Sequence, residues 1–132
     1  MQQSGPSVPF RFSRRLSEVS AKLTTRQVGD VTVIDASGRI TLGEGSTTFR
    51  EKIKELAAAG SKKVLINMGE ISYIDSSGIG ELVSGYTTIT NTGGALKLLN
   101  LGKRVQDLLQ ITKLYTVFET FEDEATAIRS FS

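Results

Sequence analysis

Short β-branched runs alternate with amphipathic segments along most of this chain, and this alternation restricts the fold more than any other feature. Two opening strands are predicted at 23–28 and 31–36, and each of the later strands, at 62–68, 95–101 and near 116–120, follows a predicted helix. Strands that alternate with helices pair in parallel, with right-handed crossovers and helical cover. The sequence therefore predicts an α/β fold with a mostly parallel mixed sheet, opened by a β-hairpin and covered by about four helices.

Turn residues and caps set the predicted boundaries. Gly29-Asp30 is a two-residue connection of the hairpin kind, residues 38–45 resemble a glycine-rich loop, and Ser46 is predicted to cap a helix that Gly60 ends. Further helices are expected over 75 to about 92, over 103–112 and from about Asp123. The apolar residues expected on the buried sides of the four helices are Phe49, Ile53, Leu56 and Ala57, then Ile79, Leu82, Val83, Tyr86 and Ile89, then Val105, Leu108 and Leu109, and finally Ala125, Ile128 and Phe131.

Residues 1–22 are predicted to be a flexible basic extension that precedes a single domain at 23–132. Both prolines lie in the first ten residues, and residues 1–26 carry five basic side chains against one acidic side chain. An alternative remains for this segment, because four apolar residues recur at helical spacing. They would form a basic amphipathic helix that touches a membrane surface or a partner, and they are Phe12, Leu16, Val19 and Leu23.

The composition excludes most enzyme classes. The chain has no histidine and no cysteine, which removes serine–histidine hydrolysis, thiol chemistry and the usual zinc sites. No phosphate-binding loop occurs, and the Gly60–Lys63 stretch lies at a helix exit rather than at a helix start. Glu70 and Asp75 could form a carboxylate site, but nothing in the sequence brings them together. We therefore expect no enzyme activity, no cofactor and no metal.

Charge and hydropathy suggest where the protein works. Residues 27–132 hold 11 basic and 13 acidic side chains, so no nucleic-acid surface is expected on the domain. No apolar run approaches the roughly 18 residues of a membrane span. The sequence predicts a cytoplasmic protein without stable membrane insertion, and it leaves the oligomeric state open.

The stretch YIDSSGIGEL, residues 73–82, places polar and small residues where a strand should pass into a helix. Asp75 suits the N-cap, and Ser76 then occupies the first helical position with an accessible hydroxyl. Gly78 and Gly80 each cost about 1 kcal/mol of helix stability relative to alanine. Capping chemistry alone explains the polar residues, but it does not explain the glycines.

The side of this helix opposite its apolar stripe is small and neutral. At 100° per residue Ser77, Gly80, Ser84 and Thr88 lie together, and Glu81 is the only charged residue between positions 76 and 91. Such a surface suits close approach by another protein, although a threonine-rich surface helix without a partner explains it as well.

Two blocks of this sequence resemble the STAS domain family, and within it the single-domain bacterial anti-anti-sigma factors, also called anti-sigma factor antagonists. The blocks are ISYIDSSGIGELVSGY and NTGGALKLLNLGKRVQDLLQITKLYTVFE, and the similarity extends from about Val28 to Phe131. In this family a serine kinase that is itself the anti-sigma factor phosphorylates the serine directly after the aspartate, and a phosphatase resets the protein.

The resemblance implies a role for each residue of the first block. Ser76 would be the phosphoacceptor and Asp75 its neighbouring acid, while Ser77, Gly78, Ile79 and Gly80, with Ser84 further along, would contact the kinase. The unphosphorylated form would bind the kinase and free the sigma factor, and the phosphorylated form would release the kinase. ATP would belong to the partner, so the chain itself needs no cofactor.

One loop departs from the family pattern. Many antagonists carry Gly-Glu-Ile/Leu-Asp after the second strand, whereas this chain has Gly38-Arg39-Ile40-Thr41. Arg39 is a candidate partner contact that would alter partner choice, since charge complementarity sets specificity, or it is an ordinary solvated loop residue. An alternative function is a STAS scaffold that is not phosphorylated, or a subunit of a signalling or lipid-transport complex.

Overall fold

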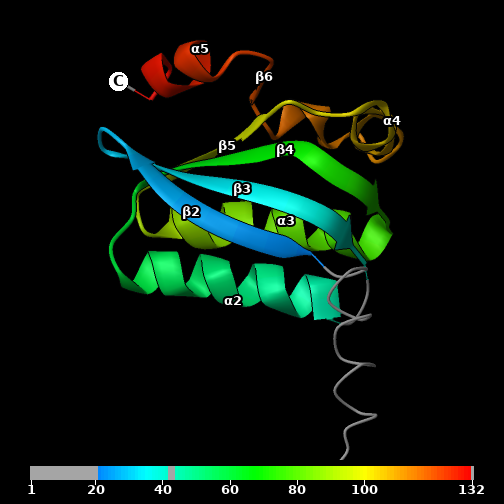
Figure 1. Ribbon diagram of the computed structural model, residues 1–132, viewed down its shortest axis with the longest axis horizontal. Helices are drawn as coiled ribbons and strands as arrows, with labels where there is room; N and C mark the ends of the chain where they lie inside the picture. The colour runs from blue at the N-terminus through cyan, green and yellow to red at the C-terminus, as the bar shows by residue number, and fades with distance from the viewer. Residues whose placement is uncertain (1–20, 42–43, 132) are drawn as a thin grey trace, which may run out of the picture.

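The structure, a computed structural model, describes residues 21–41 and 44–131, and these residues form a layered α/β fold (Figure 1). The strands of the described part form one sheet in the order β2-β3-β4-β5-β6. β2 (Lys22–Val28) pairs antiparallel with β3 (Val31–Ile40), and β4 (Lys63–Ile74), β5 (Ala95–Leu99) and β6 (Thr120–Phe121) continue the sheet in parallel. The predicted mixed sheet with an opening hairpin is confirmed.

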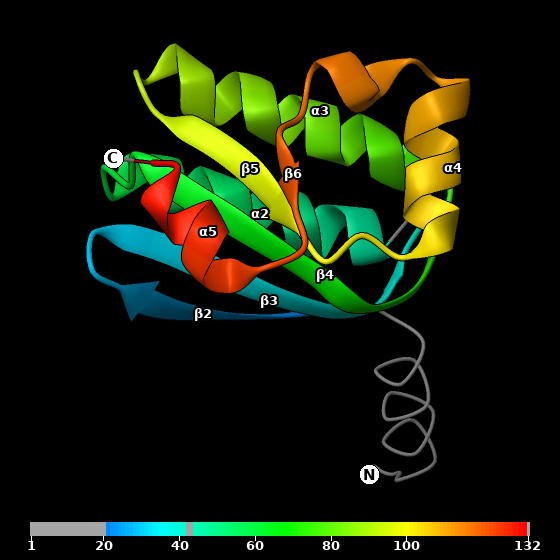
Figure 2. The same ribbon diagram turned by 90° about the horizontal axis from the view of Figure 1, so that it is seen from above.

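The helices cover both faces of this sheet. α2 (Glu44–Ala58) and α3 (Ser76–Asn91) lie side by side on one face, whereas α5 (Glu124–Arg129) lies on the other (Figures 1 and 2). α4 (Lys103–Ile111) and the short 3-10 helix η1 (Leu114–Thr116) follow β5. Within the described part of the chain, no helix is long and apolar enough to cross a membrane.

The two faces of the sheet carry two separate apolar cores. The larger core joins the sheet to α2, α3 and α4, and its fully buried side chains include Phe49, Ile66 and Leu82. The smaller core lies under α5, where Ala127 packs on Val31, Val33, Leu65 and Leu99. Most of the predicted helix positions are inside these cores, but Ala125 is exposed and Ala127 takes the inner position instead.

Several predicted boundaries were wrong. β3 continues to Ile40 and β4 to Ile74, because Arg39 and Ile40 pair with Tyr73 and Ile74 across the ladder. Pairing with a neighbouring strand supplies hydrogen bonds that local propensity does not foresee. The β3–β4 ladder has register shifts after Asp35 and after Gly38, and Gly38 has a φ of +89°.

Three further predictions need correction or placement. Ser46 is not the cap of α2, which starts at Glu44; Ser46 is buried, and its hydroxyl donates to the carbonyl of Thr41 at 2.7 Å. The last strand lies at Thr120–Phe121 because residues 114–116 form η1. The described residues begin with Ala21, which is buried, and β2 begins at Lys22, whereas residues 1–20 of the predicted extension lie outside the described residues.

Arg26 joins the opening hairpin to the last helix. Its Nε donates to Asp35 Oδ2 and its Nη2 to Glu124 Oε1, each at 2.6 Å. Hydrogen bonds from this guanidinium hold the pKa of Glu124 and the pKa of Asp35 below their ordinary values. A carboxyl group whose pKa is lower in the folded state stabilises the fold above its unfolded pKa, and this contribution is lost as the pH falls.

We expect acid to weaken the wild type more than an Arg26→Gln variant. The unfolded carboxyl pKa is near 4, so the extra loss falls below about pH 5 and continues until both carboxyl groups are protonated. Because the three side chains are 33–40% exposed, the difference in unfolding free energy should be no more than about 1 kcal/mol. Urea unfolding between pH 7 and pH 3 measures it, and parallel curves for the two proteins would contradict the assignment.

Candidate functional site

The start of α3 is held by Asp75, as the sequence predicts. The Asp75 carboxylate accepts from the backbone N–H of Gly78 at 3.0 Å, and the Asp75 carbonyl accepts from the N–H of Ile79 at 3.0 Å. Ser76 is the first residue of the helix and is exposed to solvent. The cap therefore fixes the position of Ser76 while its side chain stays accessible.

Gly78 and Ile79 belong to the interior rather than to a contact surface. A Cβ atom at Gly78 would lie 2.2 Å from the carbonyl oxygen of Ile40 and 2.6 Å from Cγ1 of Ile74. Ile79 is 2% exposed and packs in the larger core. The expectation that these two residues touch a partner is therefore corrected, because burial leaves no surface for contact. Gly78 instead lets the first turn of α3 lie directly against the end of β3.

Gly80 has a different environment. A Cβ atom there would have no neighbour within 4 Å, and the residue is exposed. The internal packing thus gives no reason for glycine at this position. Its small size leaves the helix backbone open to an approaching molecule, immediately beside Ser76.

The exposed residues of α3 form one line along the helix, which we call the exposed stripe. Its members lie at helical spacing, carry no charge, and are Ser76, Gly80, Ser84, Thr87 and Asn91. The exposed stripe is therefore rotated slightly around the helix axis relative to the face predicted from the sequence. Ser77 and Thr88 are half-buried, and Thr88 lines a narrow groove of about 60 Å³ where α2 packs against α3.

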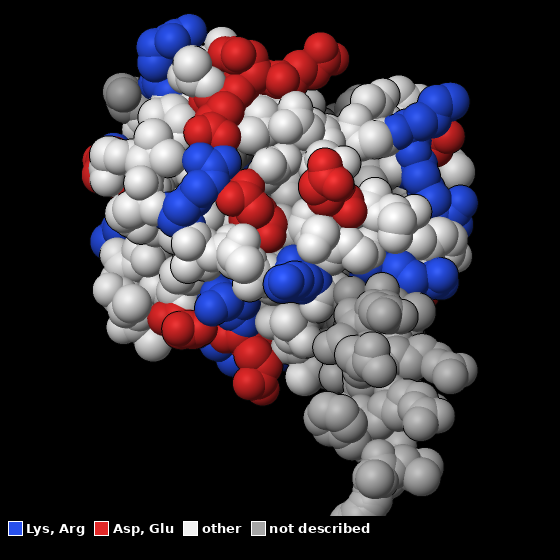
Figure 3. Space-filling model, viewed as in Figure 1, with Lys and Arg blue, Asp and Glu red and all other residues white. Residues whose placement is uncertain are grey.

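The single charged side chain of α3 is neutralised by α2. Glu81 Oε2 accepts from Arg50 Nη2 at 2.6 Å, and the Glu81 side chain is only 14% exposed. On the face of the molecule shown in Figure 3, acidic and basic side chains are likewise interspersed. Because its own members are uncharged and Glu81 is paired with Arg50, the exposed stripe presents small polar groups rather than a charged surface.

Arg39 lies in a cluster that the sequence did not reveal. Its guanidinium carbon is 4.7 Å from the ring centroid of Tyr73, and that of Arg104 is 4.2 Å from the same centroid. Arg104 Nε also donates to the carbonyl of Ile74 at 3.3 Å. A hollow of about 230 Å³ lies between the end of β4 and the start of α4, lined by Tyr73 and Arg104 among others.

Parallel pairing explains why these residues meet. β3, β4 and β5 run in the same direction, so their carboxyl ends share one edge of the sheet. Arg39 is near the end of β3, Tyr73 is near the end of β4, and Arg104 opens the helix after β5. This edge is where open α/β sheets usually bind their ligands.

Residues 22–127 match the STAS domain. The chain belongs to the STAS domain family. The predicted family and the predicted α/β fold are thereby confirmed.

Known proteins similar to this STAS domain include anti-sigma factor antagonists. The anti-sigma-B factor antagonist of Bacillus subtilis (strain 168) is 37% identical over 71 residues, which cover 54% of this chain and 64% of that protein. The alignment thus spans less than two thirds of this relative.

Two solved structures share the fold of this STAS domain. A Thermotoga maritima protein described as a candidate anti-sigma factor antagonist has a TM-score of 0.77 at 20% identity, and the match covers 83% of this chain and 93% of that one. SpoIIAA, a Bacillus cell fate determinant solved in the phosphorylated form, has a TM-score of 0.67 at 21% identity, covering 84% and 100%. At these identities the likeness supports the fold alone.

Glu70 and Asp75, the two carboxylates considered in the sequence, occupy separate places in the described part of the chain. Glu70 pairs with Ser37 along β4, whereas Asp75 caps α3 beyond the end of that strand. Among residues 21–41 and 44–131, no group of three or more acidic side chains is placed to hold a metal ion.

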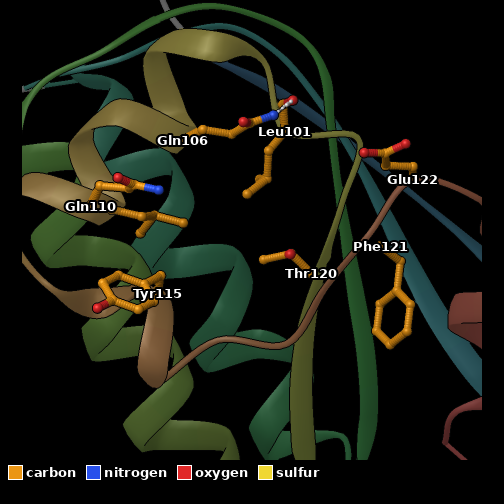
Figure 4. A pocket seen from close by; sticks show the side chains of 8 residues that line it. Leu101, Gln106, Gln110, Tyr115, Thr120, Phe121 and Glu122 are labelled. Atoms are coloured by element: carbon orange, nitrogen blue, oxygen red, sulfur yellow. Dashed lines mark hydrogen bonds between the residues drawn. The ribbon is translucent and has the colours of Figure 1, made fainter.

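A second hollow of the STAS domain, of about 280 Å³, lies between α4, η1 and β6 (Figure 4). Gln106 and Gln110 of α4 border it on one side and Phe121 of β6 lies on the other, while Gln106 Nε2 donates to the carbonyl of Leu101 at 3.0 Å. None of the predicted site residues lines this hollow. It is therefore separate from the surface around Ser76.

Proposed function

We propose that this protein is an anti-sigma factor antagonist that binds an anti-sigma factor serine kinase through the first part of the exposed stripe of α3, Ser76, Gly80 and Ser84, and releases it when Ser76 is phosphorylated. The observation that carries the proposal is the exposed hydroxyl of Ser76 at the head of an uncharged line of small residues. The names of the curated relatives support the same function.

The chemistry needed from this chain is small. In the kinase complex, Ser76 Oγ would form a bond to the γ-phosphorus of ATP while the bond from that phosphorus to ADP breaks, and the hydroxyl proton would pass to a base of the kinase. A serine phosphatase would later hydrolyse the phosphoester with water. Both catalytic sites lie on partners, so this protein acts as a substrate and a binding partner, not as an enzyme.

Phosphorylation would break the contact through bulk and charge. A phosphoserine carries about −1.5 to −2 charges at pH 7, and at position 76 it stands beside the carboxylate of Asp75. A kinase surface that lies against Gly80 and Ser84 would meet this group directly. A contact that fits a neutral hydroxyl offers the phosphate no counter-charge, and burying an unpaired charge in an interface is costly.

Affinity capture from a lysate of the source organism tests this proposal. Wild-type protein and Ser76→Ala should capture a serine kinase with ATPase activity. The amount captured by Ser76→Asp should be at least tenfold lower. Incubation with that kinase and ATP should add one phosphate to the wild type, located at Ser76 by mass spectrometry, and none to Ser76→Ala.

Thr24→Asp provides the matched control, because it adds the same charge to an exposed position of β2. This variant should bind the kinase like the wild type. Equal capture by Ser76→Asp, or a phosphate at another residue, would refute the switch. Recovery of a non-kinase assembly by wild type and Ser76→Asp alike would support the scaffold or transport-subunit alternative instead.

A further inference from the structure

Two arginines share one aromatic ring close to the phosphoacceptor. The guanidinium carbons of Arg39 and Arg104 are 4.7 Å and 4.2 Å from the centroid of Tyr73, so they lie at most about 9 Å apart, the sum of these two distances. Cation–π contacts hold each guanidinium over the ring. The ring thus keeps two like charges together on one edge of the sheet.

Within residues 21–41 and 44–131, neither arginine has a carboxylate partner. The salt bridges of this part of the chain involve other side chains, and both Arg39 and Arg104 are exposed. Arg26 and Arg50, by contrast, each contact an acid at 2.6 Å. A pair of clustered cations without an anion is prepared to receive one.

The phosphoacceptor lies within a short distance of this pair. Arg104 Nε contacts the carbonyl of Ile74 at 3.3 Å, and Ile74 is two residues before Ser76. Since consecutive Cα atoms are 3.8 Å apart, the Cα atoms of Ile74 and Ser76 are separated by less than about 8 Å. Arg104 is thus positioned at a carbonyl two residues from Ser76, so that rotation about its side-chain bonds would turn its guanidinium toward a group attached to Ser76.

We propose that Arg104 and Arg39 form an intramolecular binding site for the phosphoryl group of phosphorylated Ser76. The inference rests on the proposed function, because it concerns the phosphorylated form. The two guanidiniums offset the charge that the phosphate adds beside Asp75, and they draw the phosphoryl oxygens toward the edge of the sheet. The phosphate is thereby stabilised by the protein that carries it.

The ionisation of the phosphate tests this site directly. Phosphoserine incorporated at position 76 during translation needs no kinase, and ³¹P NMR follows its second ionisation, which is ordinarily near pH 6. Nearby cations favour the dianion, so the pKa of phosphoserine 76 should be lowered by about half a unit to one unit, a three- to tenfold increase in the acid dissociation constant. Arg104→Gln should remove most of this shift and Arg39→Gln a smaller part.

Arg129→Gln is the matched control, because it removes one exposed positive charge from α5, which lies away from α4 (Figure 2). It should leave the phosphate pKa as in the wild type. The same phosphate pKa in the wild type, Arg104→Gln and Arg39→Gln would overturn the site, and so would a value above that of free phosphoserine.

The phosphate pKa and the kinase capture test the two proposals separately. If the phosphate pKa is lowered but the unphosphorylated protein captures no kinase, the arginine site is supported and the proposed partner is refuted. If the phosphate pKa is unshifted but kinase capture depends on Ser76, the arginine site is refuted and the proposed phosphorylation switch stands. Loss of capture by unphosphorylated Arg104→Gln with an unshifted pKa would also overturn the site, and it would assign the arginine pair to the partner interface.

Discussion

Gly78→Ala is expected to lower the free energy of unfolding by about 3 kcal/mol, the upper range for overpacking a tight core. The added Cβ would lie 2.2 Å from the carbonyl oxygen of Ile40 and 2.6 Å from Ile74 Cγ1. One of these neighbours is backbone, which cannot turn away as a side chain can. Either β3 or the first turn of α3 must therefore shift, and the gain in helix propensity of about 1 kcal/mol does not offset that strain.

Denaturant unfolding followed by circular dichroism measures this loss, with Gly80→Ala as the control. The two glycines share one helix and are two residues apart, but a Cβ at Gly80 meets nothing within 4 Å. Gly80→Ala should therefore stabilise the fold by up to about 1 kcal/mol. If the two substitutions change the free energy of unfolding equally, the contact between α3 and β3 does not require glycine at position 78.

Gly80→Lys is expected to abolish kinase capture while the fold stays as stable as the wild type or becomes more stable. Lysine is a good helix former, and the position is exposed with open space around it. The long charged side chain would, however, project from the exposed stripe one turn after Ser76. Affinity capture combined with a thermal melt separates the two effects, and we expect at least a tenfold loss of captured kinase.

Asn91→Lys is the corresponding control at the far end of the same stripe. It adds the same charge to another exposed position of α3, and eleven residues of helix place it about 16 Å from Gly80. Capture should remain near the wild-type level. If Gly80→Lys binds the kinase normally, the docking surface does not include the first two turns of α3.

The sequence was sufficient to predict the start of α3 because the relevant signals are local. Asp75 lies one position before the helix, and its carboxylate reaches an N–H three residues later. The same locality explains the errors around Gly69 to Tyr73. The predicted strand ended at residue 68, but these residues pair with β3 as an extension of β4, and such pairing depends on a strand about 30 residues earlier in the chain.

The distinction between Gly78 and Gly80 also required the fold. Both glycines interrupt the same helix, and only the position of Ile40 on the neighbouring strand shows that one is packed and the other open. Arg39, Tyr73 and Arg104 are far apart in sequence and meet because parallel strands end at one edge. A sequence signal was present in the order of strands and helices, but it does not specify which side chains touch.

The tight fit of Gly78 against Ile40 has a consequence for how information passes through this molecule. The start of α3 already touches the end of β3 at Gly78. We therefore expect a modification of Ser76 to leave α3 in place. We expect both forms to share one backbone and to differ only in what they display to the outside. A variant that mimics the phosphorylated or the unphosphorylated protein then needs only the appropriate side chain at position 76, with no change of the backbone.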